Sequence, residues 1–140
     1  MRRIIFTSTT IITALVLFSC RKGESVINKA PDNLIGIWSI VYDSNNAGVG
    51  INNHPENYRG KTGDYFDFRN DSTIYIKEGF LIDTLSYHQV SSSQVIIPAF
   101  GLNAEPSTIT RYHNNTIRIE APLQITPGGA FGRKVGLLKQ

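Results

Sequence analysis

Apolar and polar residues alternate in short segments along most of this chain. The alternation begins near residue 34 and recurs up to residue 139, and the segments are separated by Gly, Pro, Asn, Asp or Ser. A period of two is the pattern of a half-buried strand, whereas an amphipathic helix repeats its apolar residues about every 3.6 positions. No stretch shows convincing helical spacing, so the sequence predicts an all-β protein.

We expect eight strands, at residues 34–43, 64–69, 73–77, 81–90, 94–98, 107–113, 116–121 and 131–139. An Asn-Asp pair joins the second and third of these strands, and an Asn-Asn pair joins the sixth and seventh, because these residues tolerate the positive φ angles of tight hairpin turns. Within the first strand, alternation places Trp38, Ile40 and Tyr42 on one face. Eight antiparallel strands can close on themselves and leave no exposed edge. The expected fold is an eight-stranded antiparallel up-and-down barrel.

Alternation also predicts which side chains point into the barrel. This inward set is Phe66, Phe68, Ile74, Ile76, Leu85, Tyr87, Val95, Ile97, Ile109, Ile117 and Ile119. One interpretation is an apolar cup that holds a small hydrophobic ligand. The other is a solid core, because barrels of about eight strands can be filled by their own side chains. The sequence leaves both interpretations open.

The first twenty residues have the layout of an export signal. Arg2 and Arg3 precede an apolar run that ends at Ser19, just before Cys20. The run is shorter than the about 20 apolar residues that a membrane-spanning helix needs. Its end, Leu-Phe-Ser-Cys, resembles the lipobox of bacterial lipoproteins. The resemblance implies cleavage before Cys20 and attachment of lipid to this residue, which is the only cysteine in the chain.

The chain therefore divides into a signal peptide at residues 1–19, a lipidated tether at residues 20–33 and a barrel domain at residues 34–140. The tether is polar and lacks apolar periodicity, as linkers do. Arg21 follows the cysteine, at the position where an aspartate would retain a lipoprotein in the inner membrane. The absence of aspartate at this position resembles the pattern of outer-membrane lipoproteins. We expect a cell-envelope protein that is anchored by lipid, at the outer membrane.

Charge changes little in this interpretation. The formal net charge is +3, but removal of Arg2 and Arg3 with the signal leaves 12 basic against 11 acidic residues. A nearly neutral domain without a basic stripe does not recruit nucleic acid. The adjacent Arg133 and Lys134 are expected to lie on a solvated face.

A short motif at the start of the first strand resembles a known family. Gly36-Ile37-Trp38 is similar to the Gly-x-Trp signature of lipocalins, and the order of elements resembles short lipocalin-like domains of bacterial lipoproteins. The resemblance implies a lipocalin-like barrel in which Gly36 lets the preceding turn approach closely and Trp38 plugs the closed end. It also implies a basic side chain from the last strand over the tryptophan, for which Lys139 and Arg133 are the candidates.

Residues that could carry catalysis or bind metal have simpler structural explanations. The histidines are His54, His88 and His113. They lack the paired spacing of metal ligands. Asp64, Asp67 and Asp71 lie close together in one expected hairpin. Asp64 is at a strand end, Asp67 is at an outward position and Asp71 is in a turn, so each has a structural explanation. No serine lies in a Gly-x-Ser-x-Gly motif. We therefore expect no catalytic residue, no metal and no cofactor.

Two functions remain open for a non-enzymatic barrel. The first is to hold a small hydrophobic ligand, with the long loop at residues 44–62 over the mouth of the barrel. The second is a structural or protein-interaction role, in which the loops at residues 45–59 and 99–106 dock an envelope protein. An enzyme would require a pair of carboxylates that the fold brings together unexpectedly.

Overall fold

A computed structural model of the chain describes residues 32–45, 57–101, 103–127 and 129–140. Almost all regular structure in these residues is β. The elements are β1 (Gly36–Asn45), β2 (Tyr58–Arg59), β3 (Tyr65–Phe68), β4 (Thr73–Glu78), β5 (Leu81–Ser86), β6 (His88–Ser91), β7 (Gln94–Ile96), the 3-10 helix η2 (Pro98–Phe100), β8 (Pro106–Arg111), β9 (Thr116–Glu120), β10 (Gln124–Thr126), β11 (Gly129–Phe131) and β12 (Arg133–Lys139).

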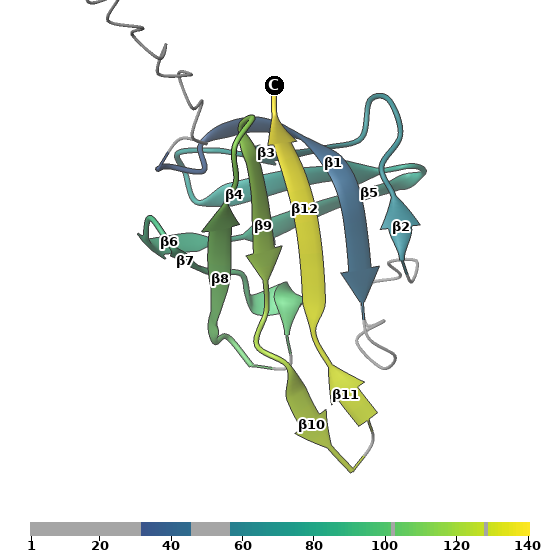
Figure 1. Ribbon diagram of the computed structural model, residues 1–140, viewed down its shortest axis with the longest axis vertical. Coiled ribbons are helices and arrows are strands. Elements are labelled where there is room, and N and C mark those ends of the chain that lie inside the picture. The colour runs from purple at the N-terminus through teal and green to yellow at the C-terminus, as the bar shows by residue number, and fades with distance from the viewer. Residues whose placement is uncertain (1–31, 46–56, 102, 128) are drawn as a thin grey trace, which may run out of the picture.

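Nine of these strands form a nearly closed antiparallel barrel in the order β5-β4-β3-β1-β12-β9-β8-β7-β6, and β2 adds to β1. Each strand pairs with the strands next to it in this order, and the last strand of the chain, β12, pairs with the first, β1. The ends of the sheet are β5 and β6, which are consecutive in the chain and separated only by Tyr87. Figure 1 shows the barrel, with β10 and β11 projecting from it as a separate hairpin.

The expected all-β barrel is confirmed, but its strand count is nine because one predicted strand is split. Residues 81–90 were expected to form a single strand, whereas the chain bends at Tyr87, whose amide donates a 2.8 Å hydrogen bond to the carbonyl of Ser72. The two halves then serve opposite edges of the sheet. The short strands β2, β10 and β11 were not expected from the sequence.

A β-bulge in β1 changes which side chains of this strand face inward. The register with β12 shifts between Ile40, which pairs with Leu137, and Tyr42, which pairs with Gly136. An extra residue in one strand turns the following residues to the other face. Tyr42 therefore lies over Gly136, where an added Cβ would overlap its ring, and the expectation that it shares a face with Trp38 is wrong.

The inward side chains form one continuous core. Its buried hydrophobic residues are Leu34, Trp38, Ile40, Phe66, Phe68, Ile74, Ile76, Tyr87, Val95, Ile97, Phe100, Ile109, Ile117, Ile119, Ala121, Val135 and Leu137. The rings of Phe68 and Tyr87 meet edge to face at 5.1 Å, and those of Phe66 and Phe100 do so at 6.2 Å. Edge-to-face contacts at these distances are favourable packing geometries. Aromatic rings therefore fill much of the space inside the barrel.

Candidate functional site

The inward face of β12 carries a basic residue at each end. Arg133 and Lys139 flank Val135 and Leu137, both of which are fully buried in the core. Because side chains of a strand alternate between its faces, these four positions share the inward face. Each of these two cations brings polar chemistry to one end of the barrel interior.

Arg133 lies in a fully buried cluster with two carboxylates. Its Nε donates to Oδ1 and Oδ2 of Asp43 at 3.1 and 3.0 Å, and its Nη2 also contacts Oδ2. Oε2 of Glu78 lies 3.9 Å from Nη2. The side chains of all three residues are at most 1% exposed. A buried charge is tolerated only when it is paired and hydrogen-bonded, which is the arrangement found here.

Aromatic rings complete the surroundings of Arg133. Its guanidinium carbon lies 4.5 Å from the centroid of the Phe100 ring and 5.8 Å from that of Phe66. Both distances are within the range of cation–π attraction. Phe100 is the last residue of η2, which begins at Pro98, and it is fully buried. The cluster therefore combines ion pairs with close aromatic packing.

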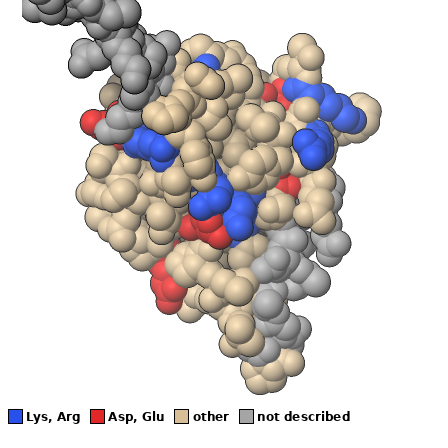
Figure 2. Space-filling view, in the orientation of Figure 1, with Lys and Arg blue, Asp and Glu red and all other residues tan. Residues whose placement is uncertain are grey.

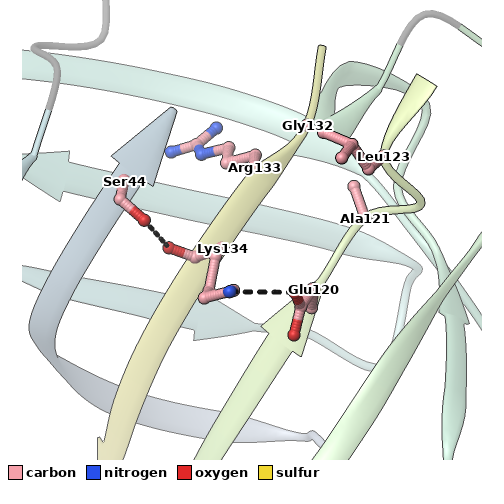
Figure 3. Close-up of a pocket in the computed structure, with 7 residues that line it drawn as sticks. All are labelled: Ser44, Glu120, Ala121, Leu123, Gly132, Arg133 and Lys134. Atoms are coloured by element: carbon pink, nitrogen blue, oxygen red, sulfur yellow. Dashed lines mark hydrogen bonds and ion pairs between the residues drawn. The ribbon is translucent and has the colours of Figure 1, made fainter. Parts of the chain in front are cut away.

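The expectation that Arg133 lies on a solvated face is wrong. Strand alternation sends Arg133 inward with Val135 and sends Lys134 outward, and Figure 3 shows the two basic side chains on opposite sides of β12. Lys134 Nζ forms a 2.9 Å ion pair with Glu120, and the hydroxyl of Ser44 donates to the carbonyl of Lys134 at 3.4 Å. Only Lys134 follows the expected pattern.

A small hollow adjoins this end of the barrel. It has a volume of about 150 Å³ and is lined by Ser44, Glu120, Ala121, Leu123, Gly132, Arg133 and Lys134 (Figure 3). The charged side chains of Glu120, Arg133 and Lys134 line it beside the apolar Ala121 and Leu123. None of its lining residues belongs to the predicted inward set.

Lys139 forms the second polar contact of β12 with the interior. Its Nζ lies 4.8 Å from the centroid of the Trp38 ring and donates a 2.6 Å hydrogen bond to the carbonyl of Ile35. The indole Nε1 of the fully buried Trp38 donates to the carbonyl of Leu34 at 2.7 Å. Gly36 has φ of +112°, and a Cβ there would overlap Nζ of Lys139. Of the two basic candidates for this contact, Lys139 is the one that lies over the tryptophan.

The beginning of the barrel domain is tied to β6 and β8. The side-chain amide of Gln89 accepts from the backbone N–H of Leu34 at 3.0 Å and donates to the carbonyl of Asp32 at 2.8 Å. Nη2 of Arg111 donates to the same carbonyl of Asp32, also at 2.8 Å. These contacts fix the point at which residue 32 leaves the barrel.

Most of the predicted ligand-lining set is buried in the core. Phe66, Phe68, Ile74, Ile76, Tyr87, Val95, Ile97, Ile109, Ile117 and Ile119 are all buried. Leu85 is partly buried and packs against them. They contact one another through the described ring contacts and strand pairs, as parts of one continuous core.

The predicted acidic residues of the β3–β4 region serve separate local roles. Asp64 accepts hydrogen bonds from the Tyr58 hydroxyl and from the amides of Lys61 and Gly79, at 2.6, 2.6 and 2.9 Å. Burial raises the pKa of Asp64, but these three bonds outweigh burial and hold its pKa below the usual range. The hydrogen bond to Asp64, aided by burial, raises the pKa of Tyr58 to about 12.

The other two aspartates also have structural partners. Asp67 is on the outward side of β3, as expected, but it is nearly buried and forms an ion pair with Arg69 at 2.5 Å. Asp71 accepts from the backbone N–H of Thr73 at 3.0 Å within the β3–β4 turn. These three aspartates therefore do not form one site.

The remaining sequence candidates are placed as follows. His88 is exposed on β6, and His113 is exposed next to the β8–β9 turn. Cys20, His54 and residues 46–56 of the long loop lie outside the described residues. In the part of the chain that is described, no group of three or more His, Cys, Asp or Glu side chains is placed to hold a metal ion.

The residues that sequence reasoning missed are Asp43, Glu78 and Phe100. Glu78 ends a strand in which Ile74 and Ile76 point inward, so alternation alone predicts that it faces the core. Asp43 carried no such signal, because the bulge that turns it inward is not visible in the pattern. The carboxylate pair that the fold brings together unexpectedly is therefore Asp43 and Glu78, held by one arginine.

No protein-family model matches the chain, and comparisons with curated proteins and with solved structures find no match either. Within the described residues, none of the helices is both long and apolar enough to cross a bilayer. Function is therefore inferred from the residues and their geometry.

Proposed function

We propose that this chain is a lipid-anchored, non-enzymatic envelope protein whose lipocalin-like barrel is a structural or protein-interaction module. The observation that carries the proposal is the continuous set of side chains that is buried inside the barrel. Phe100 and Arg133 occupy one end of the barrel, and Trp38 occupies the other. A barrel filled in this way works through its outer surface and its loops.

The lipid anchor is supported by the position of Cys20 and by the contacts that fix Asp32. An acylated Cys20 at an outer membrane would hold the barrel by a tether of residues 21–31, which enters the domain at a defined point. Several acyl chains would make the attachment effectively permanent, at about 0.8 kcal/mol for each buried CH₂.

The lipocalin-like assignment is supported by the contact between Lys139 and Trp38 next to Gly36. It is also supported by the meander in which each strand follows its neighbour around the barrel. In this proposal both features are structural.

The Asp43–Arg133–Glu78 cluster does not favour an enzymatic alternative. Arg133 directly hydrogen-bonds Asp43, and both carboxylates are fully buried. A general acid or base must reach the proton that it transfers. We assign the cluster to the stability of the mouth of the barrel.

The anchor is tested by the intact mass of the mature protein purified from membranes. We expect a chain that begins at residue 20 and carries the added mass of acyl groups, and a Cys20→Ser variant that keeps its first nineteen residues. A mature chain with an unmodified thiol would contradict the proposal.

A second candidate is the binding of a small hydrophobic ligand, which the apolar composition of the interior favours. The hollow beside Arg133, with a volume of about 150 Å³, has room for a small molecule. Native mass spectrometry of the gently purified protein distinguishes the candidates, because a retained small molecule would favour ligand binding.

A further inference from the structure

The turn between β4 and β5 exposes two large apolar side chains. Phe80 is fully exposed, at 107% of its reference area, and Ile82 is 79% exposed. In Figure 1 the joined ends of β4 and β5 lie at the right-hand edge of the barrel. A side chain that is exposed to water on all sides is fully shielded only by a binding partner that encloses it.

This turn is held in place by partly buried hydrogen bonds. Asp64 Oδ1 accepts from the amide of Gly79 at 2.9 Å, while its Oδ2 accepts from the Tyr58 hydroxyl and the Lys61 amide. Gly79 has φ of +62°, which favours glycine and lets the chain reverse tightly. The hydrogen bond and the backbone conformation at Gly79 therefore hold the next residue, Phe80, in its exposed position.

Three cationic side chains belong to the segments next to the exposed pair. Lys77 is the direct cross-strand partner of Ile82 on the outer face, and Arg59 and Lys61 are exposed beside the Asp64 hydrogen bonds. In Figure 2, lysine and arginine side chains lie at the upper right of the molecule, and others lie at its centre and left.

The acidic groups of the same region are less exposed. Asp64 and Glu78 are buried, whereas Asp83 is half-buried on β5, opposite Ile76, and its Oδ1 accepts a 2.7 Å hydrogen bond from the amide of Thr84 at the surface. The exposed basic groups near Phe80 and Ile82 therefore outnumber the exposed acidic ones. Exposed apolar side chains with basic side chains beside them are suited to the interface of a bilayer that contains anionic lipid. The apolar groups enter the bilayer, and the basic groups are attracted to the headgroups.

We propose that the β4–β5 turn is a membrane-contact element, in which Phe80 and Ile82 enter an anionic bilayer and Lys77, Arg59 and Lys61 meet its headgroups. A fluid bilayer surrounds a projecting side chain on all sides, whereas a flat protein surface covers only part of it. The two side chains are also far smaller than a stable protein interface, which buries about 800 Å² on each partner.

The proposal depends on the proposed lipid anchor in one respect, because the anchor determines which membrane the β4–β5 turn contacts. Residues 21–31 separate Cys20 from Asp32 and span at most about 40 Å when extended. A tether of this length keeps the barrel at high effective concentration next to the membrane, so a weak contact suffices.

The test uses the mature chain without its lipid, starting at residue 21, which retains every described strand and core residue. It is sedimented with vesicles of phosphatidylcholine alone or mixed with phosphatidylglycerol. We expect binding to the mixed vesicles, and about tenfold weaker partitioning for Phe80→Ser because an apolar anchor is lost. The matched control is Val90→Ser, an exposed apolar residue on β6, which should partition like the unmodified chain.

Substitution of Lys61 by Gln should weaken binding to the mixed vesicles only, and added salt should do the same. Equal partitioning of Phe80→Ser and the unmodified chain would overturn the proposal, as would absence of binding to the mixed vesicles. Photocrosslinking from position 80 in cells only to a protein would overturn it in favour of a protein partner. The intact mass at Cys20 reports on the anchor separately, so either idea can fail alone.

Discussion

The two ends of β12 use the same kind of residue in different ways. At one end, Arg133 is fully buried and is neutralised by carboxylates. At the other, Lys139 covers Trp38 and hydrogen-bonds a backbone carbonyl, without a carboxylate within ion-pair distance among the described residues. Burial lowers the pKa of Lys139, and the charge of Asp67 opposes this effect.

The difference follows from how far each cation is removed from water. A fully buried guanidinium requires counter-charges, because the cost of burying an isolated charge is large. A partly exposed ammonium retains some hydration, so a ring face and a carbonyl suffice. We therefore expect the Arg133 end to be sensitive to the loss of one partner and the Lys139 end to be more tolerant.

The largest effect is expected from Arg133→Met. This change leaves Asp43 and Glu78 buried without their cation, which should lower the free energy of unfolding by about 3–5 kcal/mol. Urea denaturation checks the change. The triple variant that adds Asp43→Asn and Glu78→Gln should recover most of the loss, because it removes the buried charges together. A triple variant no more stable than the single one would refute the electrostatic explanation.

The next effect is expected from Gly36→Ala at the opposite end. The Cβ would overlap Lys139 Nζ, and the φ of +112° is unfavourable for alanine. We expect a loss of about 1–3 kcal/mol in the free energy of unfolding. Gly101→Ala is the matched control, since its added Cβ would meet other atoms only at ordinary contact distance. Similar losses in both variants would argue against a specific constraint at Gly36.

A smaller effect is expected from Lys139→Met. The variant keeps much of the side-chain volume but loses the contact with the Trp38 ring and the hydrogen bond to Ile35, at a cost of about 0.5–2 kcal/mol. Because Trp38 is the only tryptophan, its fluorescence reports the change directly. Lys139→Arg should retain most of the contact. An unchanged spectrum and stability for Lys139→Met would show that the contact is incidental.

The smallest effect concerns Tyr58, which lies beside the turn that follows Glu78. Its pKa is about 12 in the folded protein against 10.0 ordinarily, because its hydroxyl donates to Asp64. The stability that this hydrogen bond contributes is therefore fully present below pH 10 and is lost as the pH rises from about 10 to about 12. Burial also raises the pKa of Tyr42 and of Tyr87, so absorbance titration should show several tyrosines that ionise late, and Tyr58→Phe should remove one of them. A titration unchanged by Tyr58→Phe would contradict this assignment.

The barrel was largely predictable from the sequence, because strand alternation and turn residues are local signals. Phe66 and Ile74 were correctly expected to point inward, and the hairpin between β8 and β9 was correctly expected to turn at Asn114 and Asn115, which both adopt positive φ. The split at Tyr87 was not predictable, since both halves keep the pattern of one strand. It arises from a tertiary hydrogen bond to Ser72.

The polar cluster was predictable only in part. Arg133 alternates with Val135, which is an inward signal, but its neighbour Lys134 suggested a surface pair. Asp43 could not be placed, because the bulge before Tyr42 depends on pairing with β12 and leaves no mark in the alternation. Burial of an ion cluster is a property of three strands together, and no single segment specifies it.

The central claim is that the interior of the barrel is filled by its own side chains. It is tested most directly by titrating the protein, in its Phe80→Ser form, with a hydrophobic fluorescent probe while the emission of Trp38 is recorded. We expect no saturable uptake and no energy transfer from Trp38. Uptake of one probe for each barrel, with quenching of Trp38, would contradict the claim and would restore the apolar cup.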